Sequence, residues 1–463
     1  YNIDQKGGRL LVFSGGYIHS AVVSNGYLNL AAGASATAVQ VLHPSFLLAD
    51  YDSNSVISIT VIGVHFYVGD GKMNNLFVWN NRNMVVRNGW VASNTTLLTN
   101  YTDFGVGSMT IERGGHAFET KIAYGTLIVS AGGYAEGIIQ NEGTQIVMEG
   151  GNIESAIIQG GVLNLHAGAS ATHINISGNG FMTADYTAAT RITGTSNGTL
   201  IRCGNREMSN LTVWDNRYMR VDYGWTSFNT VLDTKQEDSS VASMFVDSGG
   251  RATETTISHG ILYVNREGYA DNTTLLNGSL FVRSGGVADG GIIRGGVMHV
   301  TKGGIIKGFE LSSSGEIILS SGAEAQDLVI SNGNLKLTTG TVVTNTSVCA
   351  GGNFIISRGN VASDTQVLAT FINKGIADGG VVEAGGSLVF SSGAIVRGAF
   401  DATGLVTVKA GTVISDVSFN FNLVGLEGGN TAILNSMELL SAESYSIVVS
   451  TAQSRGSYIL ANG

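Results

Sequence analysis

Glycine turns recur in this chain at a fixed 18-residue interval. Gly132, Gly150 and Gly168 are spaced in this way, and the same interval separates Gly285 from Gly303. A constant period in this range is the signature of a solenoid or of another stacked array. We therefore expect the chain to fold by stacking one small unit many times.

Each repeat combines a short apolar alternation with a glycine turn and a second short strand. Leu127-Ile-Val129 followed by Gly132-Gly133 is one example. Alternation with a period of two indicates a β-strand, and glycine pairs indicate turns with positive φ. A unit this small cannot bury its apolar face alone, so it must pack on its neighbours. The predicted fold class is all-β, a single elongated parallel β-helix (β-solenoid) with rungs of about 18 residues.

A second, longer repeat lies over the first. Gly26–Thr37 matches Gly161–Thr172, and Leu76–Arg82 matches Leu211–Arg217, with the same offset in both cases. An inserted residue would exchange the inward and outward faces of a strand, which explains why the offset is kept without gaps. The predicted organisation is a β-solenoid over 1–430, with two copies of a 135-residue block at 26–160 and 161–295 and plain rungs at 296–430, followed by 431–463 as a C-terminal cap or the start of another module.

The glycine rhythm fades between Val41 and Gly71. The run Val56–Val61 still alternates, which is typical of strand. We interpret this stretch as less regular rungs with longer turns and not as a separate domain.

Composition excludes several classes of protein. Glycine supplies 65 of the 463 residues without a Gly-X-Y period, which excludes collagen, and 43% hydrophobic residues argue against disorder. A net charge of −10 makes nucleic acid or an anionic membrane surface an improbable partner. No stretch of 18 apolar residues predicts membrane insertion. Cys203 and Cys349 do not hold corresponding places in the repeat, so each is interpreted as a small buried apolar residue.

Four tryptophans lie in the two long blocks, two of them in a shared Trp-x-Asn-Arg spacing. Indole rings beside amide and guanidinium groups suit a sugar, because the rings give apolar contact and the polar groups give hydrogen bonds. The alternative is that the rings pack over a widened section of the solenoid and arginine covers them. We expect Trp90 and Trp225 to be the more exposed pair, because they take turn positions. The candidate ligand-binding residues are Trp79, Arg82, Trp90, Trp214, Arg217 and Trp225.

The sequence patterns that would indicate catalysis or metal binding are weak in this chain. A carbohydrate-cleaving site needs two or three carboxylates on one face, whereas the recurring Asp50 and Asp185 each have only a tyrosine as an obvious neighbour. We interpret these aspartates as turn residues. No cysteine and histidine pair has zinc spacing, and no phosphate-binding loop precedes a helix, so no catalytic residue, cofactor or metal is predicted.

The rung Gly114-Gly-His-Ala-Phe-Glu-Thr-Lys-Ile122 followed by Gly125-Thr-Leu-Ile-Val129 resembles the strand-loop-strand repeats of AIDA-type autotransporter adhesins. The resemblance implies a secreted passenger domain on the bacterial cell surface that mediates adhesion, self-association or biofilm formation. It also implies heptose acceptors among the Ser and Thr residues of the rungs. The candidate glycosylation residues are Ser35, Thr37, Ser170 and Thr172.

The leading hypothesis is a non-enzymatic surface protein that binds a second copy of itself, or glycans or proteins of another cell, by many weak contacts. One alternative is a building block of a filament or surface layer. The other alternative is a carbohydrate-active β-helix enzyme, a polysaccharide lyase or hydrolase.

Overall fold

The computed structural model describes residues 3–43, 46–61, 63–79, 81–98, 105–214, 216–234, 241–349, 351–435, 444–449 and 453–462. These residues form strands, bridges, turns and bends, and no helix is found among them. The chain divides into two compact units, Tyr1–Leu211 and Thr212–Gly463. The predicted all-β class is confirmed.

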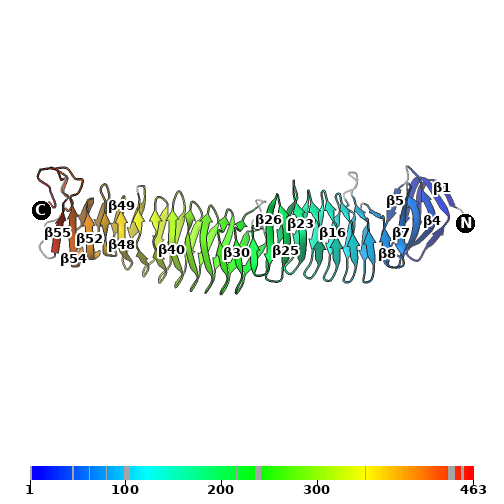
Figure 1. Ribbon diagram of the computed structural model, residues 1–463, viewed down its shortest axis with the longest axis horizontal. Helices are drawn as coiled ribbons and strands as arrows, with labels where there is room; N and C mark the ends of the chain where they lie inside the picture. Colours follow the sequence, from blue (N-terminus) through cyan, green and yellow to red (C-terminus); the bar gives the residue numbers. More distant parts are fainter. Residues whose placement is uncertain are drawn as a thin grey trace. The chain divides into compact units, whose positions relative to one another are not determined.

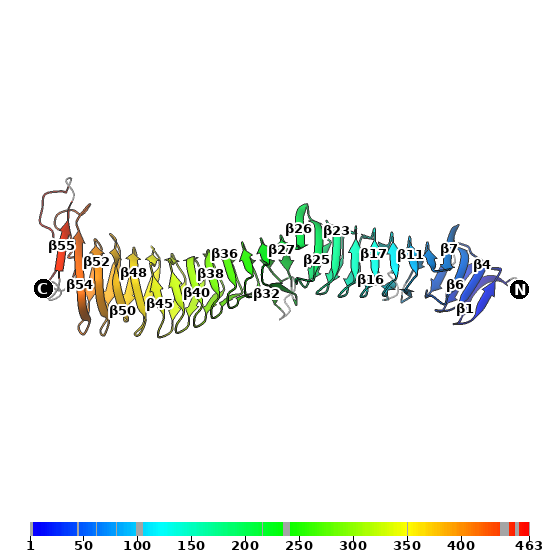
Figure 2. The ribbon, with the colours of Figure 1, turned by 60° about the horizontal axis from the view of Figure 1, so that its bottom comes forward.

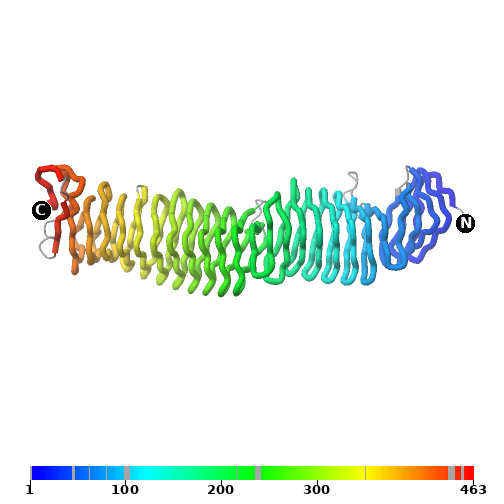
Figure 3. Tube along the Cα trace, viewed as in Figure 1, coloured from blue at the N-terminus to red at the C-terminus, as the bar shows by residue number. Residues whose placement is uncertain are grey.

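Each rung of the first unit is one turn of the chain, as the tube in Figure 3 shows. A rung contains a four-residue strand such as β16 (Thr126–Val129), a turn, and two shorter strands such as β17 (Tyr134–Glu136) and β18 (Ile139–Gln140). Their partners β19 (Thr144–Val147) and β20 (Asn152–Glu154) lie one rung further on, in parallel register. The predicted β-solenoid with 18-residue rungs is therefore confirmed (Figure 1).

Side-chain alternation explains why these segments form strands. In β16, Leu127 and Val129 are fully buried, whereas Thr126 and Ile128 are partly exposed on the outer face. Burying one such aliphatic side chain contributes about 1.5–3 kcal/mol. The inward residues of successive rungs stack on one another and form the core.

The glycine turn that follows each four-residue strand, such as Gly132-Gly133 between β16 and β17, has one outward and one inward position. Gly132 has φ +73°, a conformation that suits glycine, and the following Gly133 is buried. A Cβ added at Gly133 would lie 2.6 Å from the carbonyl oxygen of Ile111. The second position therefore faces the core, and several rungs place a fully buried alanine there. These alanines are Ala34, Ala169, Ala323 and Ala394.

The stretch with the faded glycine rhythm is an antiparallel meander. Strand β7 (Val64–Gly69) runs antiparallel to both β6 (Val56–Val61) and β8 (Lys72–Asn74). The interpretation as rungs with longer turns was wrong, because β7 is an extra strand inserted between two parallel levels. The alternation of a strand does not reveal its direction, so the sequence could not show this insertion.

The meander recurs at the offset of the long sequence repeat. Strands β25 (Arg191–Ser196), β26 (Thr199–Gly204) and β27 (Glu207–Ser209) pair antiparallel in the same order, and Figure 2 shows β26 beside β25. The secondary structure thus repeats with the long block. Where the blocks begin and end as domains remains a prediction.

The end of the second unit consists of a parallel pair and a buried segment. Strand β55 (Ser444–Val448) pairs with β54 (Val413–Asn422), and Leu434 bridges in parallel to Val406 and to Ala461. Leu434 is 1% exposed. Residues 436–443, 450–452 and 463 of the predicted cap lie outside the described residues, and its role as cap or further module remains a prediction.

The remaining strands follow the same plan. In the first unit the four-residue strands of one sheet are completed by β10 (Asn83–Val86), β13 (Ser108–Ile111), β22 (Val162–Leu165) and β24 (Phe181–Ala184). Its other strands are β1 (Ile3–Val12), β2 (Tyr17–His19), β3 (Ala21–Leu30), β4 (Ser35–Val41), β5 (Phe46–Ala49), β9 (Phe77–Val78), β11 (Val91–Ser93), β12 (Thr96–Leu97), β14 (His116–Phe118), β15 (Lys121–Ile122), β21 (Ile157–Ile158) and β23 (Ser170–Ile176).

The second unit contains two sheets of short strands. They are β29 (Tyr218–Val221), β32 (Ala242–Val246), β35 (Gly260–Val264), β37 (Ser279–Val282), β39 (Val297–Val300), β41 (Glu316–Leu319) and β44 (Asn334–Leu337), and then β47 (Asn353–Ile356), β49 (Thr370–Asn373), β51 (Ser387–Phe390) and β53 (Leu405–Val408). Its other strands are β28 (Thr212–Val213), β30 (Thr226–Phe228), β31 (Val231–Leu232), β33 (Arg251–Thr253), β34 (Thr256–Ile257), β36 (Tyr269–Leu275), β38 (Val287–Ile293), β40 (Ile305–Leu311), β42 (Glu324–Gln326), β43 (Val329–Ile330), β45 (Val342–Thr344), β46 (Ser347–Val348), β48 (Val361–Val367), β50 (Ile376–Val382) and β52 (Ile395–Ala402).

Candidate binding surfaces

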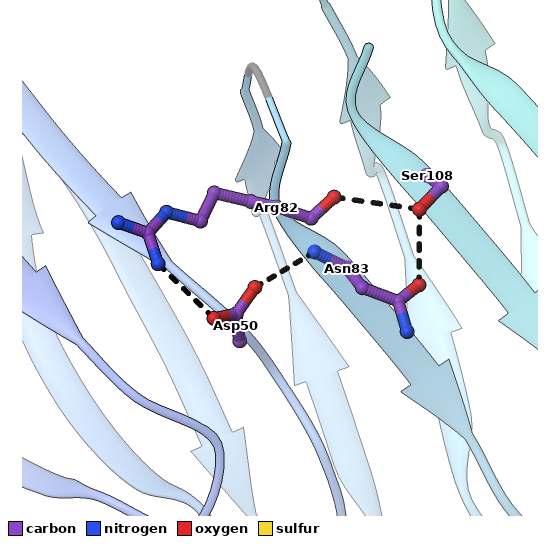
Figure 4. A network of polar contacts seen from close by, with 4 residues as sticks. All are labelled: Asp50, Arg82, Asn83 and Ser108. Atoms are coloured by element: carbon purple, nitrogen blue, oxygen red, sulfur yellow. Dashed lines mark hydrogen bonds and ion pairs between the residues drawn. The ribbon is translucent and has the colours of Figure 1, made fainter. Parts of the chain in front are cut away.

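The first Trp-x-Asn-Arg section forms a network with Asp50, shown in Figure 4. Arg82 Nη1 donates to Asp50 Oδ2 at 3.1 Å, and the backbone N–H of Asn83 donates to Asp50 Oδ1 at 2.8 Å. Ser108 Oγ donates to Asn83 Oδ1 at 3.1 Å. The interpretation of Asp50 as a turn residue was wrong, because its carboxylate binds residues more than thirty positions away. Asp185 is partly exposed at the equivalent position, and its interpretation as a turn residue remains a prediction.

Tyr51 continues this network into the core. Its side chain is 1% exposed, and its hydroxyl donates to the carbonyl of Phe77 at 3.3 Å. Burial, reinforced by the charge of Asp50, raises the pKa of Tyr51 far above its usual value. The backbone N–H of Tyr51 donates to the carbonyl of Asn83 at 2.9 Å. This section therefore joins two rungs, a structural role for Arg82 and its neighbours.

The tryptophans differ in exposure. Trp79 is partly buried, 6.2 Å from Phe77 between ring centroids, and Trp90 and Trp214 are also partly buried. Trp225 is only 8% exposed, so the expectation that it is one of the exposed pair was wrong. Trp225 occupies the inward turn position that glycine or alanine holds in other rungs. Ligand binding by the six candidate residues remains a prediction; Arg217 is partly buried as well.

The four candidate glycosylation residues lie at outward positions of β4 and β23. Ser35, Thr37, Ser170 and Thr172 are all partly exposed. Thr37 Oγ1 lies 3.2 Å from the Tyr17 hydroxyl and 2.8 Å from His19 Nδ1, so it takes part in a polar column. Their modification remains a prediction.

A ladder of stacked aromatic rings lies on the outer face of the second unit. Phe245, Tyr263, Phe281 and His299 occupy equivalent places on four successive strands, with centroid separations of 5.0, 5.3 and 4.7 Å. The rings are nearly parallel, and each is partly exposed. The sequence analysis missed these residues, although they recur at the interval of the rungs. We call these four residues the aromatic ladder.

A polar column borders the aromatic ladder. The Arg283 guanidinium lies over the Tyr263 ring at 4.5 Å and donates to Asn265 Oδ1 at 3.2 Å. Asn265 Nδ2 donates to Asp247 Oδ1 at 2.6 Å, and Arg220 Nη2 lies 2.8 Å from Asp247 Oδ2. These contacts border the aromatic ladder, whose four residues remain partly exposed.

Two carboxylates meet on the outer face of the first unit. The Tyr134 hydroxyl lies 3.1 Å from Glu136 Oε2 and 2.8 Å from Glu154 Oε2, where it can donate one proton. Burial and these two contacts raise the pKa of Tyr134. His173 Nδ1 lies 3.5 Å from Glu154 Oε1. This is a carboxylate pair that the sequence analysis did not identify, because its members are joined only by rung stacking.

The two cysteines are free thiols. Cys203 and Cys349 form no disulfide. The expectation of burial is confirmed for Cys203, which is 1% exposed, and was wrong for Cys349, which is partly exposed. Burial raises the pKa of the Cys203 thiol to about 12. Among the described residues, no group of three or more His, Cys, Asp or Glu side chains could hold a metal ion. No helix in the described part of the chain is long and apolar enough to span a membrane.

The fold defines the chain as a β-solenoid of stacked parallel rungs. No protein-family model matches its sequence, and no curated protein matches it significantly. Among solved structures it is similar to the crystal structure of a hyper-glycosylated TibA fragment, whose glycosylation is catalysed by TibC. The identity is 20%, with 74% of this chain and 99% of that chain covered and a TM-score of 0.27.

Proposed function

We propose that this chain is a non-enzymatic, secreted β-solenoid of a bacterial cell surface that mediates adhesion or self-association by repeated weak contacts. The observation that carries the proposal is the aromatic ladder, which places four partly exposed rings in one line. Contiguous exposed apolar surface marks interaction sites, and aromatic residues are enriched at interfaces.

The geometry of the ladder favours an extended, repetitive partner. Because the rings are stacked face to face, their edges and not their faces are available to a ligand. The ladder repeats at the spacing of the strands, about 4.8 Å per rung. A second copy of the same ladder has the same repeat and can meet it along its whole length. Each ring contact is weak, and linking them raises the overall strength through effective concentration.

The surface location rests on the resemblance of the rungs to those of AIDA-type autotransporter passengers. The same resemblance supports glycosylation at Ser35, Thr37, Ser170 and Thr172, and a role in biofilm formation. Intact mass spectrometry of native material tests the glycosylation, which would add sugar-sized steps to 48.2 kDa. Unmodified mass would remove glycosylation from the proposal.

A bead-clustering experiment tests the proposed contact surface. Beads coated with the wild-type chain should aggregate, and beads coated with the Phe245→Ser/Tyr263→Ser/Phe281→Ser variant should remain dispersed. A matched control replaces Val342, Leu368 and Leu405 with serine, since these side chains are 39–42% exposed and lie outside the ladder. Clustering by the control but not by the ladder variant supports the proposal. Equal clustering by all three chains contradicts it.

Two alternatives give different results. A filament or surface-layer protein would form particles that grow with concentration without a limiting size. An enzyme would use the carboxylate pair Glu136 and Glu154. The presence of this pair is the observation that favours the enzymatic alternative. Release of sugar fragments from a polysaccharide by the wild type, lost in Glu154→Gln, would replace the adhesive proposal with an enzymatic one.

A further inference from the structure

Two turns of the second unit share a contact within an Asn-Gly pair. The backbone N–H of Gly278 donates to the side-chain Oδ1 of Asn277, the residue before it, at 2.9 Å. Gly333 and Asn332 make the same contact at 2.8 Å. Both asparagines are exposed. The first turn leads into β37 and the second into β44, strands of one sheet, so the two pairs hold equivalent places in the repeat.

The fold requires glycine at the second position of these turns. Gly278 and Gly333 have φ +85° and +89°, a conformation that suits glycine. A Cβ added to Gly278 would lie 2.3 Å from the carbonyl oxygen of Gly260 in the previous rung. The first position is less restricted, because the rung before Asn332 holds Ser314 there. Stacking of the rungs therefore does not require the asparagines.

The contact brings together the two atoms that react when an asparagine loses its amide. Oδ1 is bonded to Cγ, so the nitrogen of the following glycine lies beside the carbon that it attacks. Holding two reacting groups together in this way accelerates an intramolecular reaction. Among the described residues, the N–H groups of Gly278 and Gly333 donate to these side chains and to no backbone carbonyl. No backbone hydrogen bond therefore holds these nitrogens away from Cγ.

Two other Asn-Gly pairs lack this contact, although their asparagines are also exposed. In Asn88-Gly89 the glycine N–H donates to the carbonyl of Gly114 at 3.0 Å. In Asn179-Gly180 it donates to the carbonyl of Ser177 at 3.1 Å. The glycine nitrogen of each pair is thus held by the backbone, and the folded structure protects these two asparagines from the same attack.

We propose that Asn277 and Asn332 are sites of spontaneous deamidation in the folded protein. The glycine nitrogen loses its proton to water and forms a bond to Cγ of the asparagine. The Cγ–Nδ2 bond breaks, and the side-chain nitrogen takes up a proton and leaves as ammonia. Water then opens the succinimide ring at either of its two carbonyl carbons, which gives aspartate or isoaspartate. Each event adds a negative charge to the turn and is independent of the adhesive function proposed above.

Peptide mapping by mass spectrometry tests these sites during incubation of the full folded chain at mildly alkaline pH. The peptides that contain Asn277 and Asn332 should gain the mass difference between an amide and an acid. Asn88 and Asn179 should convert about tenfold more slowly or less, because their glycine nitrogens are held elsewhere. After denaturation in urea all four should convert at similar rates, since the hydrogen bonds that distinguish them are lost.

A variant with one additional Asn-Gly pair supplies the matched control. Ser314→Asn creates this pair at an exposed position of the turn between β40 and β41. The N–H of Gly315 in this turn donates to the carbonyl of Ser312 at 3.2 Å. The introduced asparagine should therefore convert as slowly as Asn88. Circular dichroism verifies that the variant is folded.

The rates of conversion decide the proposal. Fast conversion at Asn277 and Asn332, with slow conversion at Asn88 and at the introduced asparagine, supports it. Amides that persist at Asn277 and Asn332 in the folded chain overturn it. Equal rates at all Asn-Gly pairs of the folded chain also overturn it, because the contact between the glycine N–H and Oδ1 would then have no effect.

Discussion

Arg82 Nη1 lies 3.1 Å from Asp50 Oδ2, although 32 positions separate the two residues in the chain. Their side chains are 25% and 29% exposed, so solvent screens the pair only in part. The antiparallel meander β6–β8 lies between them in sequence. The contact joins the rung before the meander to the rung after it.

Removing the carboxylate of Asp50 should loosen this junction. Asp50→Ala should cost about 1.5–3 kcal/mol locally, because a charged hydrogen bond is lost and Arg82 is left without this partner. Hydrogen exchange is the suitable measurement, because it reports the local opening of this junction separately from the unfolding of the other rungs. The amides of Tyr51 and Val85, which bond across the junction, should exchange faster.

The control for this change is an exposed ion pair. Arg266 and Glu267 are 82% and 63% exposed, and Arg266→Ala should leave exchange unchanged. If Asp50→Ala leaves the Tyr51 amide as protected as in the wild type, the junction does not depend on this contact.

Trp225 should act as a core residue. Trp225→Ala should destabilise its rung by about 3–5 kcal/mol, the usual cost of removing a buried aromatic ring. Tyr223, two residues away and 83% exposed, gives the matched control in Tyr223→Ala. The thermal midpoint of the unfolding step should fall clearly in the first variant and stay nearly constant in the second. Similar midpoints for the two variants would show that Trp225 does not pack as described.

Asn373 is a buried side chain whose amide nitrogen and oxygen both lack a hydrogen-bond partner among the described residues. An unpaired buried amide costs about 1–3 kcal/mol, so Asn373→Leu should raise the thermal midpoint. The exposed Asn353→Leu, at the start of β47, should change it little. A lower midpoint for Asn373→Leu would show that the amide is satisfied or needed.

The two thiols should react differently. Cys203 is buried and its pKa is about 12, whereas Cys349 is partly exposed. A maleimide at neutral pH should modify one thiol per folded chain, at Cys349, and two after denaturation. Two modified thiols in the folded chain would contradict the burial of Cys203.

The raised pKa also gives a direction to alkaline stability. The folded thiol stays protonated while the unfolded thiol, with its ordinary pKa of 9.0, ionises. The stabilisation of the folded state by the raised pKa of Cys203 is therefore complete below pH 9 and is lost as the pH rises toward 12. Cys203→Ala should show a smaller fall in thermal midpoint over this range than the wild type. An equal fall in both chains would assign the effect to other groups.

The repeat could be predicted from the sequence because each rung is formed by residues that are consecutive in the chain. The glycine interval identified the period of the rungs, and the constant offset between Gly26–Thr37 and Gly161–Thr172 identified the block that recurs in the secondary structure. The direction of β7 was not predictable, because parallel and antiparallel strands alternate in the same way. The inward position of Trp225 was missed because the second turn residue was taken as outward, although Ala34 and Ala169 hold the equivalent places.

The candidate surfaces were harder to predict from the sequence than the repeat was. The partner of Asp50 lies beyond an inserted meander, so no local pattern pointed to Arg82. The aromatic ladder could have been predicted from the sequence, because Phe245, Tyr263 and Phe281 recur at the period of the rungs. The carboxylate pair of Glu136 and Glu154 recurs at the same period, and it becomes meaningful only when the rungs are seen to stack in register.

The most direct test of the proposed function is sedimentation velocity of the chain over a dilution series. The wild type should associate as its concentration rises, and the Phe245→Ser/Tyr263→Ser/Phe281→Ser variant should sediment as a monomer throughout. Association of the ladder variant equal to that of the wild type, or a wild type that stays monomeric at every concentration, would contradict the claim that the aromatic ladder is a contact surface between copies.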